Sequence, residues 1–284
     1  MAIRIITDSA ADYSAQEIEK RQIACIPMTV TFGDTEYLDG RDITKEQFFE
    51  LLTNGSDFPR TSQPSPASFL EYFEAAKEAG DTVIAVLVSS ALSGTFQNAV
   101  LAKSMAEYED IFIIDSKIAT LGMRILVDRA VRMRDRGCSP QEIVTEVEHL
   151  KPRLRLFAGL DTLEYLAKGG RLSKTAATLG NLANLKPIIT FTQEGNVTLC
   201  GKQMGIRHAC KQTAKLVMEN EPDMNEPIYL LYSHEQKNCA AFHHALQKNG
   251  LKIDTPKVRG IGPIIGTHIG TNAFGIVYVA KETD

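Results

Sequence analysis

The run Thr82–Val88 restricts the fold more than any other feature, because it is apolar and β-branched along nearly its whole length. A strand without polar alternation is buried on both faces, which is typical of a parallel sheet covered by helices. Ile3–Ile6 and Ile111–Ile114 are similar runs, and Ile23–Phe32 is a further apolar stretch rich in Val, Thr and Ile. Segments with helical signals alternate with these strands, so the sequence predicts an α/β fold with a parallel sheet.

The expected helices carry recognisable end signals. Ser14, Thr44, Ser65 and Ser139 each stand where a side-chain oxygen can accept a hydrogen bond from a free amide of a first helical turn. Thr44 and Ser139 are followed three residues later by a glutamine or a glutamate, which completes a capping box. We therefore expect helices at Ala15–Arg21, 45–55, Pro66–Gly80, 95–106, Thr120–Arg136 and Pro140–Leu150.

The second half of the chain is less regular. The turn Gln193-Glu194-Gly195-Asn196 predicts a hairpin, and a hairpin implies antiparallel pairing in a mixed sheet. We place a boundary near Lys151-Pro152, between an N-terminal domain (1–150) and a C-terminal domain (151–284). The expected strands of the second half are Leu154–Leu160, Pro187–Phe191, Val197–Cys200, Ile228–Tyr232 and Ala273–Val279, with helices at Ile206–Glu221 and Gln236–Asn249.

Composition excludes several functional classes. Lys+Arg 31 against Asp+Glu 35 gives a net charge of −4, whereas a general nucleic-acid binder is usually basic. No apolar run approaches the ~18 residues of a membrane span, and the first residues lack the pattern of a secretory signal. The five cysteines are scattered without a C-x-x-C pair, which argues against a disulfide framework or a structural zinc site. We expect a cytoplasmic protein with no metal, no nucleic-acid partner and no stable membrane insertion.

The segment Ser89–Thr95 joins the buried strand to the helix that follows it. In an open parallel sheet, ligands bind at the carboxyl ends of the strands, and a helix N-terminus there offers free amides to an anion. Ser93 and Thr95 add hydroxyl groups, and Gly94 allows the backbone to approach a ligand closely. The simpler alternative is that Ser93 only caps the helix.

A second candidate lies in Phe58–Pro66, which its prolines are expected to hold as a rigid loop. Thr61, Ser62 and Gln63 are consecutive there, so three hydrogen-bonding side chains are close together. The alternative is a turn followed by a helix cap, which is common for serine and proline. If strands and helices alternate as expected, this loop shares the strand-end region with Ser93.

The third candidate is His268, in the glycine-rich segment Gly260–Gly275. The glycines indicate tight backbone rather than a regular element. A lone histidine is more often structural than functional, but one in a loop is a better candidate, since loops carry function disproportionately. Cys239 and His243 lie four residues apart on an expected helix, but their spacing matches no recognised metal site.

Seven short motifs follow one another along the chain: Thr7-Asp8-Ser9, Thr61-Ser62-Gln63-Pro64-Ser65-Pro66, Ser89-Ser90-Ala91-Leu92-Ser93-Gly94-Thr95, Asp115-Ser116, Gly169-Gly170-Arg171-Leu172-Ser173-Lys174, Lys186-Pro187-Ile188 and Ile265-Gly266-Thr267-His268. Each is weak alone. In this order and spacing they resemble the DegV family of bacterial fatty-acid-binding proteins, over nearly the whole chain. The family often has Gly-Pro-Gly soon after the histidine, where this chain has Gly270-Thr271-Asn272.

The resemblance implies a three-layer α/β/α N-terminal domain with a parallel sheet and a C-terminal α/β domain with a mixed sheet. A long-chain, palmitate-like fatty acid lies in a tunnel between them. The resemblance implies that Thr61 and Ser93 hold its carboxylate and that His268 lies near the same head group. The neighbouring Ser62, Gly94 and Thr95 complete the expected binding set. Some members present the fatty acid to a separate fatty acid kinase, which makes an acyl phosphate for phospholipid synthesis. On this interpretation the protein is a lipid carrier rather than an enzyme, with a fatty acid ligand and no cofactor.

An alternative function from a different class is a serine-dependent acyl hydrolase. In that hypothesis Ser93 is the nucleophile, His268 the base, and Asp8 or Asp115 the acid that orients the histidine. The sequence around Ser93 lacks the full G-x-S-x-G pattern of a nucleophile elbow, which counts against this function.

Overall fold

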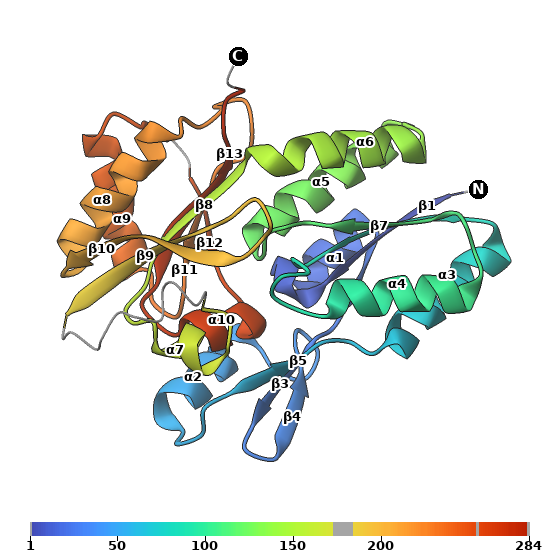
Figure 1. The fold of residues 1–284 in the computed structure, drawn as a ribbon, viewed down its shortest axis with the longest axis horizontal. Coiled ribbons are helices and arrows are strands. Elements are labelled where there is room, and N and C mark those ends of the chain that lie inside the picture. Colours follow the sequence, from blue (N-terminus) through green and yellow to red (C-terminus); the bar gives the residue numbers. More distant parts are fainter. Residues whose placement is uncertain (1, 173–183, 254–255, 283–284) are drawn as a thin grey trace.

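The computed structural model describes residues 2–172, 184–253 and 256–282, which form two main sheets and a small third sheet (Figure 1). The first sheet is parallel throughout, in the order β2-β1-β6-β7, as the apolar runs predict. Its strands are β1 (Ile3–Asp8), β2 (Ile23–Ile26), β6 (Thr82–Leu87) and β7 (Ile111–Asp115).

Helices cover both faces of this parallel sheet, which gives the expected three-layer arrangement. Every residue of β6 is buried, because the strand is central and neither of its faces meets solvent. Ile6 packs with Phe69 and Phe73 of one helical layer, whereas the adjacent Ile5 belongs to the core on the opposite side. The helices of the two layers are α3 (Pro66–Ala79) and α4 (Thr95–Ala106) on one face, and α5 (Leu121–Asp135) and α6 (Pro140–Leu150) on the other.

The second main sheet is mixed, in the order β10-β9-β8-β13-β11-β12; among its described strands, β11 and β12 pair in parallel and the other neighbours pair antiparallel. The predicted hairpin joins β9 to β10. The strands are β8 (Leu154–Gly159), β9 (Leu185–Phe191), β10 (Val197–Met204), β11 (Tyr229–Tyr232), β12 (Lys257–Gly260) and β13 (Phe274–Val279), and the helices on one face are α8 (Ile206–Glu219) and α9 (Lys237–Lys248).

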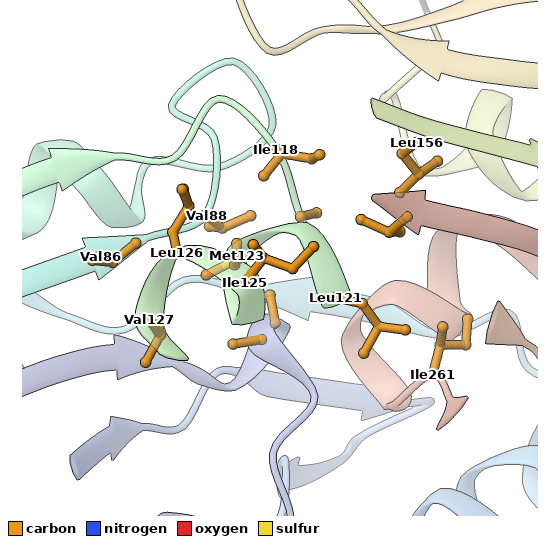
Figure 2. Close-up of a cluster of buried hydrophobic side chains, with 14 of the residues drawn as sticks. Val86, Val88, Ile118, Leu121, Met123, Ile125, Leu126, Val127, Leu156 and Ile261 are labelled. Carbon is orange, nitrogen blue, oxygen red and sulfur yellow. The ribbon is translucent and has the colours of Figure 1, made fainter. Parts of the chain in front are cut away.

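The other face of the mixed sheet packs against the N-terminal part of the chain. Leu156 of β8 and Ile261, just after β12, share one core with Leu121 and Met123 of α5 (Figure 2). The two main sheets come from residues before and after position 150, and they meet across this core. The division into domains 1–150 and 151–284 remains our interpretation of that arrangement.

A third, antiparallel sheet was not expected from the sequence. It has the order β4-β3-β5 and consists of β3 (Thr29–Phe32), β4 (Thr35–Leu38) and β5 (Arg60–Ser62). The prediction of a loop over Phe58–Pro66 is therefore wrong at its centre. β5 exists because its backbone pairs with β3, a partner distant in sequence that local turn chemistry does not reveal. The apolar stretch Ile23–Phe32 likewise divides into β2 and β3, which belong to different sheets.

The expectation of irregular backbone over Gly260–Gly275 is also wrong. The segment contains the helix α10 (Pro263–Ile269) between β12 and β13. Proline at the first position of a helix is favoured, because its missing amide would lack an intrahelical partner there in any case. His268 consequently lies on a helix and not in a loop.

The remaining elements are short or lie at the edges. Capping boxes form at Thr44 and Ser139 as predicted, and a third forms at Ser14. None of the helices in the described ranges is long and apolar enough to span a membrane. The remaining elements are α1 (Ala15–Arg21), α2 (Lys45–Asn54), α7 (Glu164–Lys168) and the 3₁₀ turns η1 (Ser9–Ala11) and η2 (Lys151–Arg153).

Candidate functional site

A cavity of about 400 Å³ lies where the mixed sheet meets the N-terminal part of the chain. Most of its wall is apolar and comes from strands of the mixed sheet, from α10 and from the loops that end β6 and precede α5. Representative lining residues are Leu156, Ala158, Ile189, Leu231, Ile264 and Ile269. Such a wall can hold an apolar ligand but offers little to a charged one.

The polar part of the wall centres on Thr61 and His268. Thr61 lies on β5 and His268 in the last turn of α10, and the two elements bring Oγ1 and Nε2 to 3.0 Å from each other. Burial, and then the positive charge of Arg171, lower the pKa of His268 to about 4. The imidazole is therefore neutral at pH 7, and its buried Nδ1 has no hydrogen-bond partner among the described residues.

Ser93 reaches the same cavity from the loop between β6 and α4. Its hydroxyl lies 2.8 Å from the hydroxyl of Thr95 and accepts a hydrogen bond from the Thr95 amide. The N-cap of α4 is Gly94, so Ser93 is not the N-cap residue that the simpler alternative proposed. Ser93 still binds a first-turn amide, but its side chain also faces the cavity.

The predicted site residues occupy two positions relative to the cavity. Thr61, Ser62, Ser93 and His268 line it, whereas Gly94 and Thr95 lie behind that lining. The Gly94 amide donates to Gln63 at 2.9 Å and the Thr95 amide donates to Ser93, so these two amides are already engaged. A Cβ at Gly94 would lie only 2.4 Å from the Gln63 side chain, which explains the glycine at this position.

Sequence reasoning did not name the cavity-lining side chain of Arg171 as a site residue. Gln63 was one of the three hydrogen-bonding side chains of the second candidate but was left out of the expected binding set, and the structure shows that it lines the cavity and accepts a hydrogen bond from the Gly94 amide. Arg171 follows α7, where its guanidinium donates to the carbonyl groups of Leu92 and Gly169. The motif from Gly169 to Lys174 was the available signal for Arg171, and Ser173 and Lys174 of that motif lie outside the described residues.

The polar end of the cavity faces a second, open depression on the surface. Thr61, Arg171 and His268 line both spaces, so they stand at the boundary between the apolar interior and solvent. The outer depression also carries Arg60 and Lys168. A ligand with a charged head and an apolar tail would therefore place its head at this boundary.

Comparison with known proteins identifies the family. The profile described as "Uncharacterised protein, DegV family" matches residues 2–281. The chain belongs to the DegV family.

Relatives of this DegV protein agree with it over nearly their whole length. A DegV domain-containing protein from Caldanaerobacter subterraneus is 36% identical over 280 residues, which cover 98% of this chain and 99% of the relative. The solved structure of a fatty-acid-binding DegV family protein from Thermus thermophilus has 30% identity and a TM-score of 0.88, covering 99% of this chain and 100% of that chain. A stearic-acid-binding protein from Eubacterium ventriosum has 27% identity and a TM-score of 0.86, covering 99% of both chains.

The structure of this DegV protein does not assemble the hydrolase triad considered from the sequence. Nε2 of His268 contacts Thr61 rather than Ser93, and no carboxylate among the described residues orients Nδ1. Asp8 instead accepts hydrogen bonds from two backbone amides, and Asp115 forms an ion pair with Lys117 at 2.8 Å. Within the described ranges, no three His, Cys, Asp or Glu side chains are grouped so that they could hold a metal ion.

Proposed function

We propose that this protein binds a long-chain, palmitate-like fatty acid, with the tail in the apolar cavity and the carboxylate at Thr61 and Ser93. The observation that carries the proposal is a deep apolar cavity whose polar side chains gather where it meets the surface. The Thermus thermophilus and Eubacterium ventriosum relatives, described as fatty-acid- and stearic-acid-binding, support it.

The proposed ligand fits the energetics of such a cavity. An acyl tail of about fourteen methylene groups, at roughly 0.8 kcal/mol each, gains on the order of 11 kcal/mol on burial. Ordering the chain and losing rigid-body freedom offset much of this gain. The carboxylate cannot be buried without partners, because an unpaired charge is costly in an apolar environment.

The head-group contacts follow from the neutral state of His268. With its proton on Nε2, the imidazole donates to Thr61 Oγ1, and the Thr61 hydroxyl is then free to donate to the carboxylate. This tautomer also avoids placing an N–H on the buried Nδ1, where it would have no hydrogen-bond acceptor among the described residues. Ser93 supplies a second hydroxyl, and Arg171 supplies the positive charge that balances the carboxylate.

We further propose that the protein is a carrier that presents its fatty acid to a separate protein, such as a fatty acid kinase. What supports this is the position of the proposed head group at the open depression, where a partner can reach the carboxylate while the tail stays enclosed. The protein's own residues would then bind and orient the acid, and the partner would carry out the chemistry.

Organic extraction of the purified protein, followed by mass spectrometry, tests the ligand. We expect about one long-chain fatty acid per chain, and delipidated protein should take up palmitate. An empty extract from protein that also refuses palmitate would contradict the proposed function. Stoichiometric labelling of Ser93 by a fluorophosphonate probe would contradict the carrier role and restore a nucleophilic one.

The head-group assignment is tested by Thr61→Ala and Ser93→Ala. Each change removes one hydrogen bond to a charged group, so palmitate binding should weaken by about 1–3 kcal/mol in calorimetric titration. Ser104→Ala is the matched control, because Ser104 is an exposed serine of α4 that lies outside the cavity. Wild-type affinity in both Thr61→Ala and Ser93→Ala would refute the assignment.

A further inference from the structure

Asp12 is a buried carboxylate that joins segments far apart in the chain. It is only 6% exposed, and its backbone has a left-handed conformation (φ 59°), which aspartate tolerates better than most residues. One oxygen accepts a hydrogen bond from the Gly262 amide at 2.6 Å. The other accepts from the Thr120 hydroxyl at 2.5 Å. The carboxylate therefore contacts the N-terminal ends of two helices, α10 and α5.

At the N-terminus of α10, Asp12 supplies the side-chain cap that the helix's own N-cap residue lacks. Gly262 is the N-cap residue and has no side chain, so the local sequence cannot cap this helix. Asp12 binds the N-cap amide, which the glutamate of a capping box binds in other helices. A Cβ at Gly262 would lie 2.6 Å from the Asp12 carboxylate, so only glycine permits this approach.

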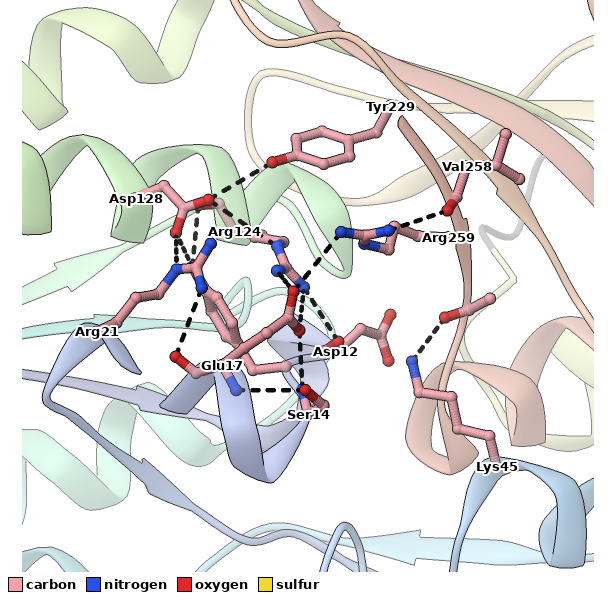
Figure 3. A network of polar contacts seen from close by, with 12 residues as sticks. Asp12, Ser14, Glu17, Arg21, Lys45, Arg124, Asp128, Tyr229, Val258 and Arg259 are labelled. Atoms are coloured by element: carbon pink, nitrogen blue, oxygen red, sulfur yellow. Dashed lines mark hydrogen bonds and ion pairs between the residues drawn. The ribbon is translucent and has the colours of Figure 1, made fainter. Parts of the chain in front are cut away.

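Lys45 holds the same segment from a second direction. Its ammonium group donates to the Gly260 carbonyl at 2.6 Å, two residues before the amide that Asp12 binds (Figure 3). Both hydrogen bonds join a residue of the N-terminal part of the chain to a residue just before α10. The position of α10 is therefore fixed from outside the mixed sheet.

The two helix ends that Asp12 contacts both matter to the cavity. α10 carries His268 in its last turn and contributes Ile264 and Ile265 to the apolar wall. Thr120 lines the same cavity with φ 52° and ψ −133°, a conformation that is unfavourable for a β-branched residue. Its hydrogen bond to Asp12 helps to hold it there. One carboxylate thus connects the wall at Thr120 with the helix that bears the head-group histidine.

We infer that Asp12 is a positioning residue: it fixes α10 so that His268 Nε2 meets Thr61 Oγ1, and it ties this contact to the cavity wall at Thr120. The consequence for fatty-acid binding rests on the function proposed above. The placement of His268 does not, since it can be measured in the protein without a ligand.

The test is Asp12→Asn, which keeps the side-chain volume and the tolerance of the left-handed conformation. Its carboxamide oxygen can accept only from one of the two donors, while its NH₂ group faces the other. Asp39→Asn is the matched control, because Asp39 is a neighbouring acid of similar burial (8% exposed) that is not bonded to Gly262 or Thr120. Lys45→Met is a second variant, at a half-exposed residue, that tests the same segment if Asp12→Asn does not fold.

The first measurement is the ¹⁵N spectrum of the histidine side chains in the delipidated protein, with His268→Gln used to assign the His268 signals. We expect Asp12→Asn and Lys45→Met to shift the His268 Nε2 signal that reports its bond to Thr61, and Asp39→Asn to leave it in place. An unshifted signal in both Asp12→Asn and Lys45→Met would overturn the inference. Equal shifts in Asp12→Asn and Asp39→Asn would also overturn it, by showing a general effect of losing a buried acid.

The second measurement is palmitate affinity in a double-mutant cycle. Asp12→Asn should weaken binding about tenfold, the loss expected for one misplaced hydrogen bond to a charged group. In a His268→Gln background the same change should cost much less, because the two residues act together. Equal costs in both backgrounds would contradict action through His268. If the wild type takes up no palmitate but the spectral shifts occur, the positioning role stands and the proposed function fails.

Discussion

His268 is a histidine that the fold keeps uncharged, because burial and the nearby Arg171 lower its pKa to about 4. In the unfolded chain a histidine titrates near pH 6.5. Between these two pH values the unfolded chain binds a proton that the folded protein does not, so stability falls as the pH falls.

The pH dependence of stability should therefore differ between the wild type and His268→Gln. From about pH 6.5 to 4 the wild type should lose stability more steeply, since only the wild type contains the group that resists protonation when folded. Urea denaturation at a series of pH values measures the slope, and the exposed His244→Gln is the control that should follow the wild type. Parallel curves for the wild type and His268→Gln would contradict a depressed pKa.

Only the difference between these curves reports on His268, because three buried acids act in the opposite direction. Burial raises the pKa of Asp8 and of Asp39 to about 7, and it also raises the pKa of Asp12. Each acid retains a proton in the folded state that it loses in the unfolded state, so its contribution to stability declines as the pH rises towards 7. The wild-type curve alone is the sum of both effects.

Residue chemistry in the sequence identified much of the candidate site, but it did not show which of its groups are hydrogen-bonded to one another. Thr61, Ser93 and His268 were found because hydroxyl and imidazole groups in strand-end segments suggest binding, and the structure brings Thr61 and His268 to 3.0 Å from each other. The amides of Gly94 and Thr95 were expected to face a ligand, but the side chains of Gln63 and Ser93 occupy them. Such pairings depend on where separate segments meet, which local sequence does not specify.

At the level of elements, the sequence predicted best where local signals and burial agree. α2, α3 and α6 begin at their predicted capping residues, and β6 is buried on both faces as its apolar sequence requires. β5 was missed because it is a strand through backbone pairing with β3, a segment distant in sequence. α10 was missed because its glycines resemble a loop, while its cap comes from a residue 250 positions earlier.

The tip of the β9–β10 hairpin gives a prediction at this level. Gly195 is buried, with φ +87°, and its carbonyl accepts a hydrogen bond from the Ser89 hydroxyl at 2.9 Å. A Cβ there would lie 2.1 Å from the Ser89 hydroxyl and 3.0 Å from the Lys117 backbone. Gly137 has a similar φ of +80°, but a Cβ there would have no atom of another segment within 4 Å, so Gly137 isolates the conformational cost.

Gly195→Ala should therefore destabilise the protein more than Gly137→Ala, by about 1–3 kcal/mol, the usual cost of overpacking. Urea denaturation measures the two losses. Because Phe191 and Val197, the strand pair that flanks this turn, line the cavity, Gly195→Ala should also release palmitate faster. Equal losses of stability in the two variants would show that the hairpin tip can move away from Ser89 without a cost in stability.

Across the whole molecule, a polar network complements the apolar core that joins the two main sheets. Arg124 of α5 is 1% exposed and forms an ion pair with Glu17 of α1 (Figure 3). From the mixed-sheet side, Arg259 lies 3.7 Å from the same Glu17 carboxylate, and Tyr229 donates to Asp128 at 3.5 Å. The carboxylates of Glu17 and Asp128, which lie around the buried Arg124 guanidinium, are therefore contacted by residues from both parts of the chain.

Removing the Arg124 guanidinium tests how much this polar network contributes to the stability of the fold. Burial acts to raise the pKa of Glu17, but the hydrogen bonds from Arg124 and from the Ser14 amide, with the positive charges of Arg124 and Arg259, together outweigh burial and lower the pKa to about 2. Arg124→Met leaves the carboxylates of Glu17 and Asp128 without this partner, so it should destabilise the protein by about 3–5 kcal/mol at pH 7. The exposed Arg132→Met on the same helix is the control and should stay close to the wild type.

The sign of the pH dependence separates the charge effect from simple loss of packing. A carboxylate with a lowered pKa stabilises the fold above its unfolded pKa near 4.5, and this contribution is lost as the pH falls towards 2. The difference in free energy of unfolding between the wild type and Arg124→Met should therefore become smaller as the pH falls over this range. Adding Glu17→Gln to Arg124→Met should recover part of the loss at pH 7, because it removes a carboxylate that has lost its partner. A difference that is constant with pH, and no recovery in the double variant, would mean that Arg124 acts through packing on the Tyr13 ring, 4.3 Å away, rather than through its charge.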